Sequence, residues 1–132
     1  MTEVTNKRQV INIPGVSHGA TPIPVAVRKG NMLYTSGIEP VDPETGRNGT
    51  TPEKQAELTF RHMREILESA GATPDDVTLV TVYMTDESYR PLVNKYWLEM
   101  FPDPENRPAR KAIIVDKPAS LFVQIQIVAV LS

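Results

Sequence analysis

The sequence contains no cysteine, and this absence excludes several kinds of chemistry at once. Without thiols the chain has no disulfide framework, no thiolate nucleophile and no zinc site built on cysteine. Its two histidines, His18 and His62, stand far apart, and neither has a second ligand at the spacing that metal sites use. No glycine-rich phosphate loop is present either. We therefore predict that the chain binds no metal and no other cofactor.

A surplus of positive charge is also missing, since the formal net charge is -2. A dedicated nucleic-acid binder neutralises phosphates with lysine and arginine, so the composition argues against an RNA or DNA partner. No apolar run approaches the roughly 20 residues needed to cross a bilayer. The first residues lack the apolar segment of a secretory signal. We expect a cytoplasmic protein without a membrane partner.

The residues that are present fit a single domain, residues 1–132, with 40% hydrophobic and 23% charged residues. Alternating or β-branched runs predict strands, and apolar residues at helical spacing predict helices. The expected elements, in order, are strands at 8–13, 23–28 and 32–36, a helix at 52–70, a strand at 77–85, a helix at 88–100, and strands at 107–115 and 121–130. The segment 41–49 between the third strand and the first helix is expected to be a loop.

The first helix has clear boundary signals. Thr51 can cap its N-terminus, Pro52 suits its first position, and Gly71 is a natural stop. On this helix we expect His62 to lie on the polar side, and we expect His18 to be solvated in a loop. Neither histidine is therefore predicted to act as a general base.

Two helices can cover only one face of a sheet of this size. In the last strand, period two places Gln124 and Gln126 on the same face as Phe122, Val128 and Val130. This uncovered face is apolar enough to need a partner. We infer that subunits pack sheet to sheet, and that a site could lie between chains.

The segment that leads into the strand of Arg110 is conformationally restricted, because Pro108 fixes its own φ and restricts the residue before it. A planar guanidinium suits bidentate recognition of a carboxylate. The alternative, an ion pair with Asp103 or Glu105 at the strand mouth, stays open at this point. Glu39 poses a similar choice between a site at a strand mouth and an ordinary surface carboxylate.

Four motifs resemble the Rid family, the reactive intermediate deaminases formerly called YjgF, over about residues 22–131. They are Tyr34–Gly46 (YTSGIEPVDPETG), Val93–Trp97 (VNKYW), Arg107–Arg110 (RPAR) and Val123–Val130 (VQIQIVAV). The resemblance implies a chorismate-mutase-like α+β domain, with a mixed sheet and two helices packed on one face. It also implies a homotrimer with the sheets facing inward and ligand clefts at the subunit interfaces.

The resemblance implies an activity as well. In the family, the arginine that matches Arg110 grips the carboxylate of an imine or enamine, and water then adds to the imine carbon to release ammonia and a 2-oxo acid. Ser36, Gly37 and Asn94 match polar positions of the family cleft, so we expect them to bind the substrate.

Three positions depart from the family pattern. Ile23 stands where many deaminating members have tyrosine, and Gln124 stands where they have the glutamate thought to position water. An amide can orient water but cannot take its proton, so Glu39 is a candidate to replace the missing acid. Lys111 would add positive charge next to Arg110, which suggests a second acidic group on the substrate, as in an aminomuconate-type intermediate.

The leading hypothesis is therefore an enzyme that deaminates small enamine or imine carboxylic acids, with Arg110 and Gln124 as catalytic residues. The residues expected to line its substrate site are Ser36, Gly37, Asn94, Lys111, Ile23 and Glu39. A second hypothesis is a protein of the same fold that binds small carboxylates without chemistry. A weaker third is a ribonuclease or translation inhibitor, which the acidic composition disfavours.

Overall fold

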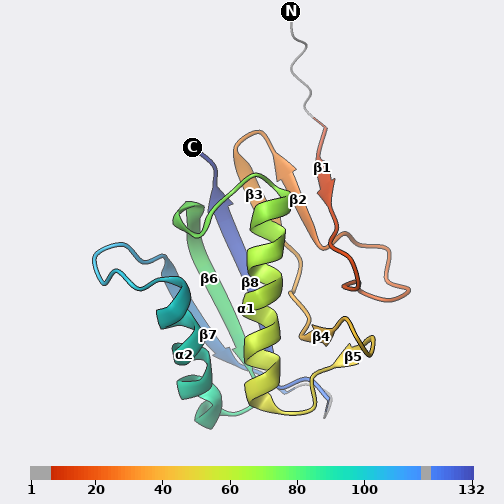
Figure 1. Ribbon diagram of the computed structural model, residues 1–132, viewed down its shortest axis with the longest axis vertical. Coiled ribbons are helices and arrows are strands. Elements are labelled where there is room, and N and C mark those ends of the chain that lie inside the picture. The colour runs from red at the N-terminus through yellow and green to blue at the C-terminus, as the bar shows by residue number, and fades with distance from the viewer. Residues whose placement is uncertain (1–6, 117–119) are drawn as a thin grey trace, which may run out of the picture.

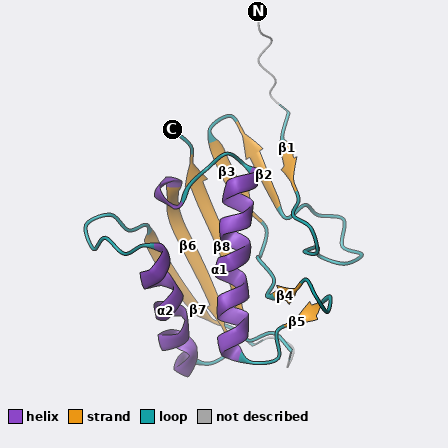
Figure 2. Ribbon diagram, in the orientation of Figure 1, coloured by secondary structure: helices purple, strands orange, loops and turns teal. Residues whose placement is uncertain are grey.

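The computed structural model describes residues 7–116 and 120–132. Most of the N-terminal segment that is expected to lack a secretory signal lies outside these residues. Two helices cross one face of a six-stranded sheet (Figures 1 and 2). The sheet strands, in spatial order, are β1 (Gln9–Ile11), β2 (Ala26–Lys29), β3 (Met32–Thr35), β8 (Val123–Val130), β6 (Val77–Met84) and β7 (Ala109–Ile114). The helices are α1 (Pro52–Ser69) and α2 (Arg90–Met100).

The smaller elements lie in the connections. A separate two-stranded ribbon consists of β4 (Val41–Asp42) and β5 (Arg47–Asn48), and single 3₁₀ turns, η1 (Pro74–Asp76) and η2 (Glu87–Tyr89), precede β6 and α2. The ribbon falls in the segment expected to be a loop. That expectation was wrong because two-residue strands are too short to show a period.

The boundary signals in the sequence act as expected. The Thr51 hydroxyl accepts a hydrogen bond from the Lys54 amide at 3.1 Å, and Pro52 occupies the first turn of α1. Gly71 has φ +76°, a conformation that favours glycine, directly after the end of the helix. Strand β2 starts later than predicted because Pro22 and Pro24 have no amide hydrogen for the ladder.

The connection from β6 through α2 to β7 joins two parallel strands, and β8 lies antiparallel between β3 and β6. The predicted α+β class, the order of the main elements and the two helices on one face are thereby confirmed. No helix in the described part of the chain is long and apolar enough to cross a membrane.

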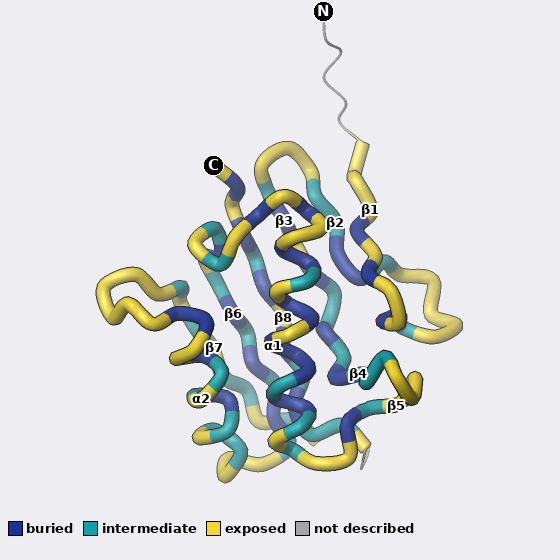
Figure 3. Tube along the Cα trace, viewed as in Figure 1, coloured by how far each residue is buried: buried dark blue, intermediate teal, exposed yellow. Residues whose placement is uncertain are grey.

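The core lies between the sheet and the helices, where the buried segments of the strands are seen behind α1 and α2 (Figure 3). Strand β8 alternates as predicted, because its buried residues are Val123, Ile125, Ile127 and Ala129. Strand β6 was expected to be largely buried, but it alternates too. No helix of the described residues covers its second face.

On that open face one apolar row crosses all six strands. The register pairs Val10 with Val27, Val27 with Tyr34, Tyr34 with Val128, Val128 with Leu79, and Leu79 with Ala109. Val10 is 56% exposed and Tyr34 46% exposed. A continuous apolar row of this kind on one face is the signature of a surface that packs against another protein surface.

Candidate functional site

The first group of predicted site residues lies at the corner between β3 and β4, beside β8. We call Ser36, Gly37, Glu39 and Gln124 the corner cluster. The Ser36 hydroxyl donates to the Pro24 carbonyl at 2.8 Å, and the Ile38 amide donates to the Ile125 carbonyl at 2.6 Å. The corner is therefore fastened both to the segment before β2 and to the central strand of the sheet.

Within the corner cluster, backbone and side chains are in close contact. A Cβ atom placed on Gly37 would lie 2.6 Å from the amide nitrogen of Gln124, so a side chain at position 37 would require the Gln124 amide to move. The same Gln124 nitrogen donates to the Glu39 carboxylate at 3.0 Å. Glu39 is half-buried and held near the strand mouth, and its role in a site stays a prediction.

The two histidines do not lie where we expected. His62 is fully buried on α1, and its Nε2 lies 2.6 Å from the Val41 carbonyl oxygen. His18 is half-buried, and its Nε2 lies 2.8 Å from the Gly37 carbonyl oxygen. The prediction for His62 failed because the β4–β5 segment covers a side of the helix that two helices and a sheet would leave open. Leu58 and Ile66, one turn on either side of His62, gave the signal that could have found it.

The second group lies at the edge of the sheet, where β7 meets α2. Arg90, Asn94 and Trp97 recur at helical spacing on α2, and the Arg110 guanidinium lies 5.2 Å from the centre of the Trp97 ring. We call these four residues the edge cluster. This distance is within the range of a cation–π interaction, which uses none of the guanidinium N–H donors.

Arg110 does not form the alternative ion pair. Among the described residues, no carboxylate lies within salt-bridge distance of it, Asp103 and Glu105 included. Burial lowers the pKa of Arg110, and the nearby charge of Arg90 lowers it further. Arg107, by contrast, is used structurally, because its Nε donates to the Phe101 carbonyl at 2.8 Å.

Two of the substituted positions lie apart from Arg110. Lys111 pairs with Thr81 and Arg110 with Val80, so the two cations point to opposite faces of β7. The expectation that Lys111 adds charge beside Arg110 is therefore wrong within one chain, since neighbours in a strand alternate. Ile23 is 45% exposed in the segment before β2.

One chain does not bring the predicted catalytic pair together. Arg110 lies on the helix side of the edge strand, whereas Gln124 lies on the open face of β8, with β6 between these strands. The lateral distance across two strand spacings is roughly 10 Å, before the thickness of the sheet is added. A site that uses both clusters needs two chains.

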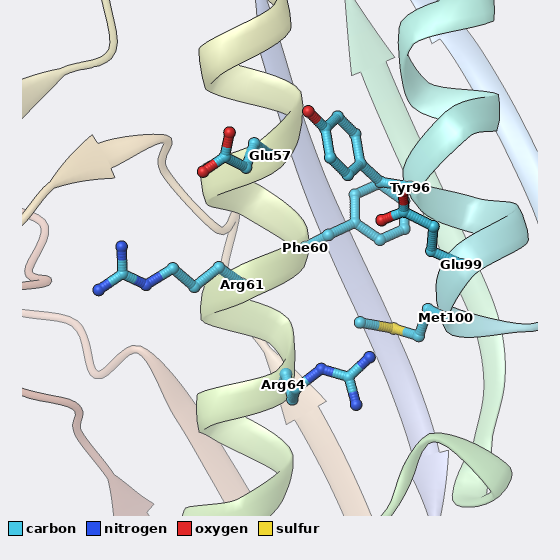
Figure 4. A pocket seen from close by; sticks show the side chains of 7 residues that line it. All are labelled: Glu57, Phe60, Arg61, Arg64, Tyr96, Glu99 and Met100. Carbon is cyan, nitrogen blue, oxygen red and sulfur yellow. The ribbon is translucent and has the colours of Figure 1, made fainter.

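A separate groove of about 230 Å³ lies between α1 and α2 (Figure 4). Phe60 and Tyr96 lie in it with ring centres 6.2 Å apart, and Arg61 points away from them. Arg61 and Glu57 are each engaged in an ion pair along α1. None of the predicted site residues lines this groove, and the described residues contain no group of three possible metal ligands.

Comparison with known proteins points to one family. The family model described as Endoribonuclease L-PSP matches residues 20–131. A RutC family protein of Pyrococcus abyssi is 34% identical over 111 residues, which cover 82% of this chain and 85% of the relative. Reactive Intermediate Deaminase A, chloroplastic, of Arabidopsis thaliana is 28% identical over 127 residues, covering 95% and 67% respectively.

A solved structure extends the agreement to three dimensions. The crystal structure of Escherichia coli TdcF with bound serine has a TM-score of 0.83 and 27% identity, covering 94% of this chain and 99% of that chain. The match spans nearly all of both chains, so the sheet order and the helix layer are common to both. The chain belongs to the Rid family, formerly called YjgF, whose model carries the description Endoribonuclease L-PSP.

Proposed function

We propose that this chain hydrolyses the carbon–nitrogen bond of small imine or enamine carboxylic acids, releasing ammonia and a 2-oxo acid. A relative that matches 95% of the chain is named a reactive intermediate deaminase. The observation that carries the proposal is the contact between Gln124 and Glu39, because it places a carboxylate where the family's glutamate is missing.

The edge cluster would hold the substrate. Arg110 has no carboxylate partner among the described residues and lies over Trp97, so its fork is free to receive a carboxylate from the ligand. Partial burial strengthens such a pair relative to one in water. Asn94 lies one turn before Trp97 on the same face of α2 and can bond the same ligand.

The corner cluster would supply the chemistry. Glu39 takes a proton from water as the oxygen bonds to the imine carbon, and returns that proton to the imine nitrogen, which gives a carbinolamine. In the second step Glu39 takes the hydroxyl proton and passes it to the nitrogen as the carbon–nitrogen bond breaks, so that ammonia leaves, the oxygen becomes the carbonyl of the 2-oxo acid and Glu39 is regenerated. The Gln124 amide orients Glu39 without titrating itself, and Ser36 and Gly37 shape the wall of the cleft.

The two clusters would meet between subunits of a homotrimer whose open sheet faces turn inward. The apolar row from Val10 to Ala109 on the uncovered face supports such packing. The placement of Arg110 and Gln124 on opposite faces supports a cleft shared by two chains. Analytical ultracentrifugation tests this directly, and a monomeric mass at assay concentration would contradict the shared cleft.

A second acidic group on the substrate, as in an aminomuconate-type intermediate, is the finer part of the proposal. Its support moves from Lys111 to Arg90, which lies on the helix stripe that ends at Trp97 and whose charge acts on Arg110. Over the seven residues from Arg90 to Trp97, the helix rises by roughly 10 Å. Within the chain the Arg90 guanidinium bonds the Glu87 carboxylate at 2.9 and 2.7 Å, so a second carboxylate of the substrate would take the place of Glu87 there.

The decisive experiment measures ammonia release from 2-iminopropionate and 2-iminosuccinate, generated in situ from alanine and aspartate by amino-acid oxidases. Loss of semicarbazone trapping reports the rate. We expect acceleration by the wild type that disappears in Arg110→Ala, whereas Arg64→Ala, a surface arginine outside both clusters, retains it. No acceleration over the uncatalysed rate with either imine would refute the proposal for these substrates.

A second candidate is a protein that binds small carboxylates without turnover. Gln124 and Ile23, which replace a glutamate and a tyrosine of the family pattern, favour it. This candidate requires saturable binding of a 2-oxo acid that Arg110→Ala abolishes, together with an unaltered rate of imine hydrolysis. Calorimetry with pyruvate beside the ammonia assay separates the two functions.

A further inference from the structure

Both histidines of this chain bond to the same short corner. His18 contacts the carbonyl oxygen of Gly37 at 2.8 Å, and His62 contacts that of Val41 at 2.6 Å. A carbonyl oxygen can only accept, so Nε2 carries the proton in each ring. The two contacts fall two residues before and two residues after Glu39, which therefore lies in the middle of a segment clamped at both ends.

The backbone between Gly37 and Val41, the two residues that the histidines contact, forms further hydrogen bonds of its own. The Ile38 amide donates to the Ile125 carbonyl at 2.6 Å, and the Pro40 carbonyl accepts from the Gly49 amide at 2.9 Å. The Glu39 side chain is held differently, since its hydrogen bond among the described residues comes from Gln124. The direction of the carboxylate thus depends on where the Gln124 amide lies.

The position of Gln124 in turn depends on Gly37. A Cβ on Gly37 would lie 2.6 Å from the Gln124 nitrogen and 2.7 Å from its Cδ, so the backbone of Gly37 packs directly on the amide. A shift of Gly37 therefore changes the surface against which the Gln124 amide lies. The contacts form a continuous path from His18 through Gly37 and Gln124 to Glu39.

We propose that His18 is a positioning residue of this site, which fixes the Gly37 corner through its ring N–H and thereby holds the Gln124–Glu39 pair in its working orientation. The inference rests on the proposed function and adds a residue to it. His18 has no other hydrogen bond in the described chain, and its Nδ1 is buried without a partner. Among the described residues, the ring therefore forms a hydrogen bond only to the Gly37 carbonyl oxygen.

Replacing His18 and replacing His62 would have different effects. His62 is fully buried between α1 and the β4 segment, so its replacement would disturb the core. His18 is half-buried in a connection, so it can be changed while the fold is retained. The matched variants are His18→Gln, whose amide keeps an N–H donor at a similar reach, and His18→Leu, which keeps the bulk without a donor.

For the kinetic test we expect His18→Leu to lower kcat by about fivefold, the equivalent of one neutral hydrogen bond. KM should stay within twofold, because Arg110 belongs to the other cluster, and His18→Gln should recover most of the rate. In a Glu39→Gln background, the His18→Leu change should cost nothing further. Equal losses in both backgrounds would show that His18 does not act through Glu39 and would overturn the proposal.

A second readout does not depend on turnover. In ¹⁵N-edited spectra, the side-chain amide of Gln124 should shift and exchange faster with solvent in His18→Leu, while His18→Gln resembles the wild type. If the resonance and the exchange rate of the Gln124 amide are unchanged in a folded His18→Leu protein, the inference is overturned, whether or not the protein shows turnover. Conversely, the wild type can show no turnover while the Gln124 amide resonance still shifts in His18→Leu. That result would support the coupling of His18 to Gln124 and would contradict only the proposed reaction.

Discussion

The substitution Glu39→Gln tests the chemical core of the proposal at the least structural cost. A glutamine at this position has nearly the same shape, and its carbonyl oxygen can still accept the hydrogen bond that Gln124 gives at 3.0 Å. What it loses is the ability to take a proton from water. The variant therefore removes the base and leaves the contact that holds it.

Positioned general bases contribute roughly 10²- to 10⁴-fold to a rate. Because imines hydrolyse without help and demand only modest acceleration, we expect the lower end of that range, a loss of about 100-fold in kcat. KM should change less than twofold, since the carboxylate anchor Arg110 is untouched. The assay is ammonia release from 2-iminopropionate with purified protein, and a thermal melt confirms that Glu39→Gln is folded.

Two results would refute the reasoning. An unaltered kcat would mean that Glu39 is not the base, and the rate would then have to come from positioning and electrostatic stabilisation of the transition state alone. A large rise in KM with unchanged kcat would mean that Glu39 contacts the substrate in its ground state instead. Glu39→Asp serves as the control, because it keeps the base but shortens its reach.

Three further predictions concern the anchor, the substrate and the assembly. Arg110→Lys should raise KM by about tenfold, because an ammonium cannot bond a carboxylate in the bidentate manner of a guanidinium; an unchanged KM for 2-iminopropionate would contradict the anchor. Arg90→Ala should reduce the preference for 2-iminosuccinate over 2-iminopropionate by about tenfold, the scale of a charged hydrogen bond, and equal losses on both imines would argue against a second carboxylate contact. Val128→Glu places a charge in the apolar row and should give monomers in ultracentrifugation together with loss of turnover, whereas a trimer that persists would locate the interface elsewhere.

Periodicity and capping chemistry predicted most of the fold, because these signals act within a few residues of each other. Thr51, Pro52 and Gly71 marked the ends of α1 correctly, and the alternation of β8 identified its buried face. The ribbon β4–β5 was missed because its strands are too short to show a pattern. The burial of His62 was missed with it, because this ribbon is what covers that side of α1.

The sequence names candidate site residues, whose roles stay predictions, but it does not give their arrangement. The family pattern named Arg110, Gln124, Ser36, Gly37 and Asn94, yet nothing in that pattern says that Arg110 and Gln124 lie on opposite faces of the sheet. Strand alternation alone could have separated Lys111 from Arg110, since adjacent residues in a strand cannot share a face. His18 gave no signal, because its contact with Gly37 spans 19 positions and depends on the path of a loop.

In the proposed mechanism, the Gln124–Glu39 contact lets Glu39 take over the role of the family's glutamate. A carboxylate at position 124 would lie beside that of Glu39, and two anions in hydrogen-bond contact cannot both stay ionised at low cost. With glutamine at 124, an amide donor meets a single carboxylate and holds its direction. The substitution Gln124→Glu should therefore not increase the proposed activity. It should raise the pKa of one of the two acids and shift the acidic limb of the pH–rate profile upward, whereas a faster enzyme with an unmoved profile would show that position 124, not 39, is where the base belongs.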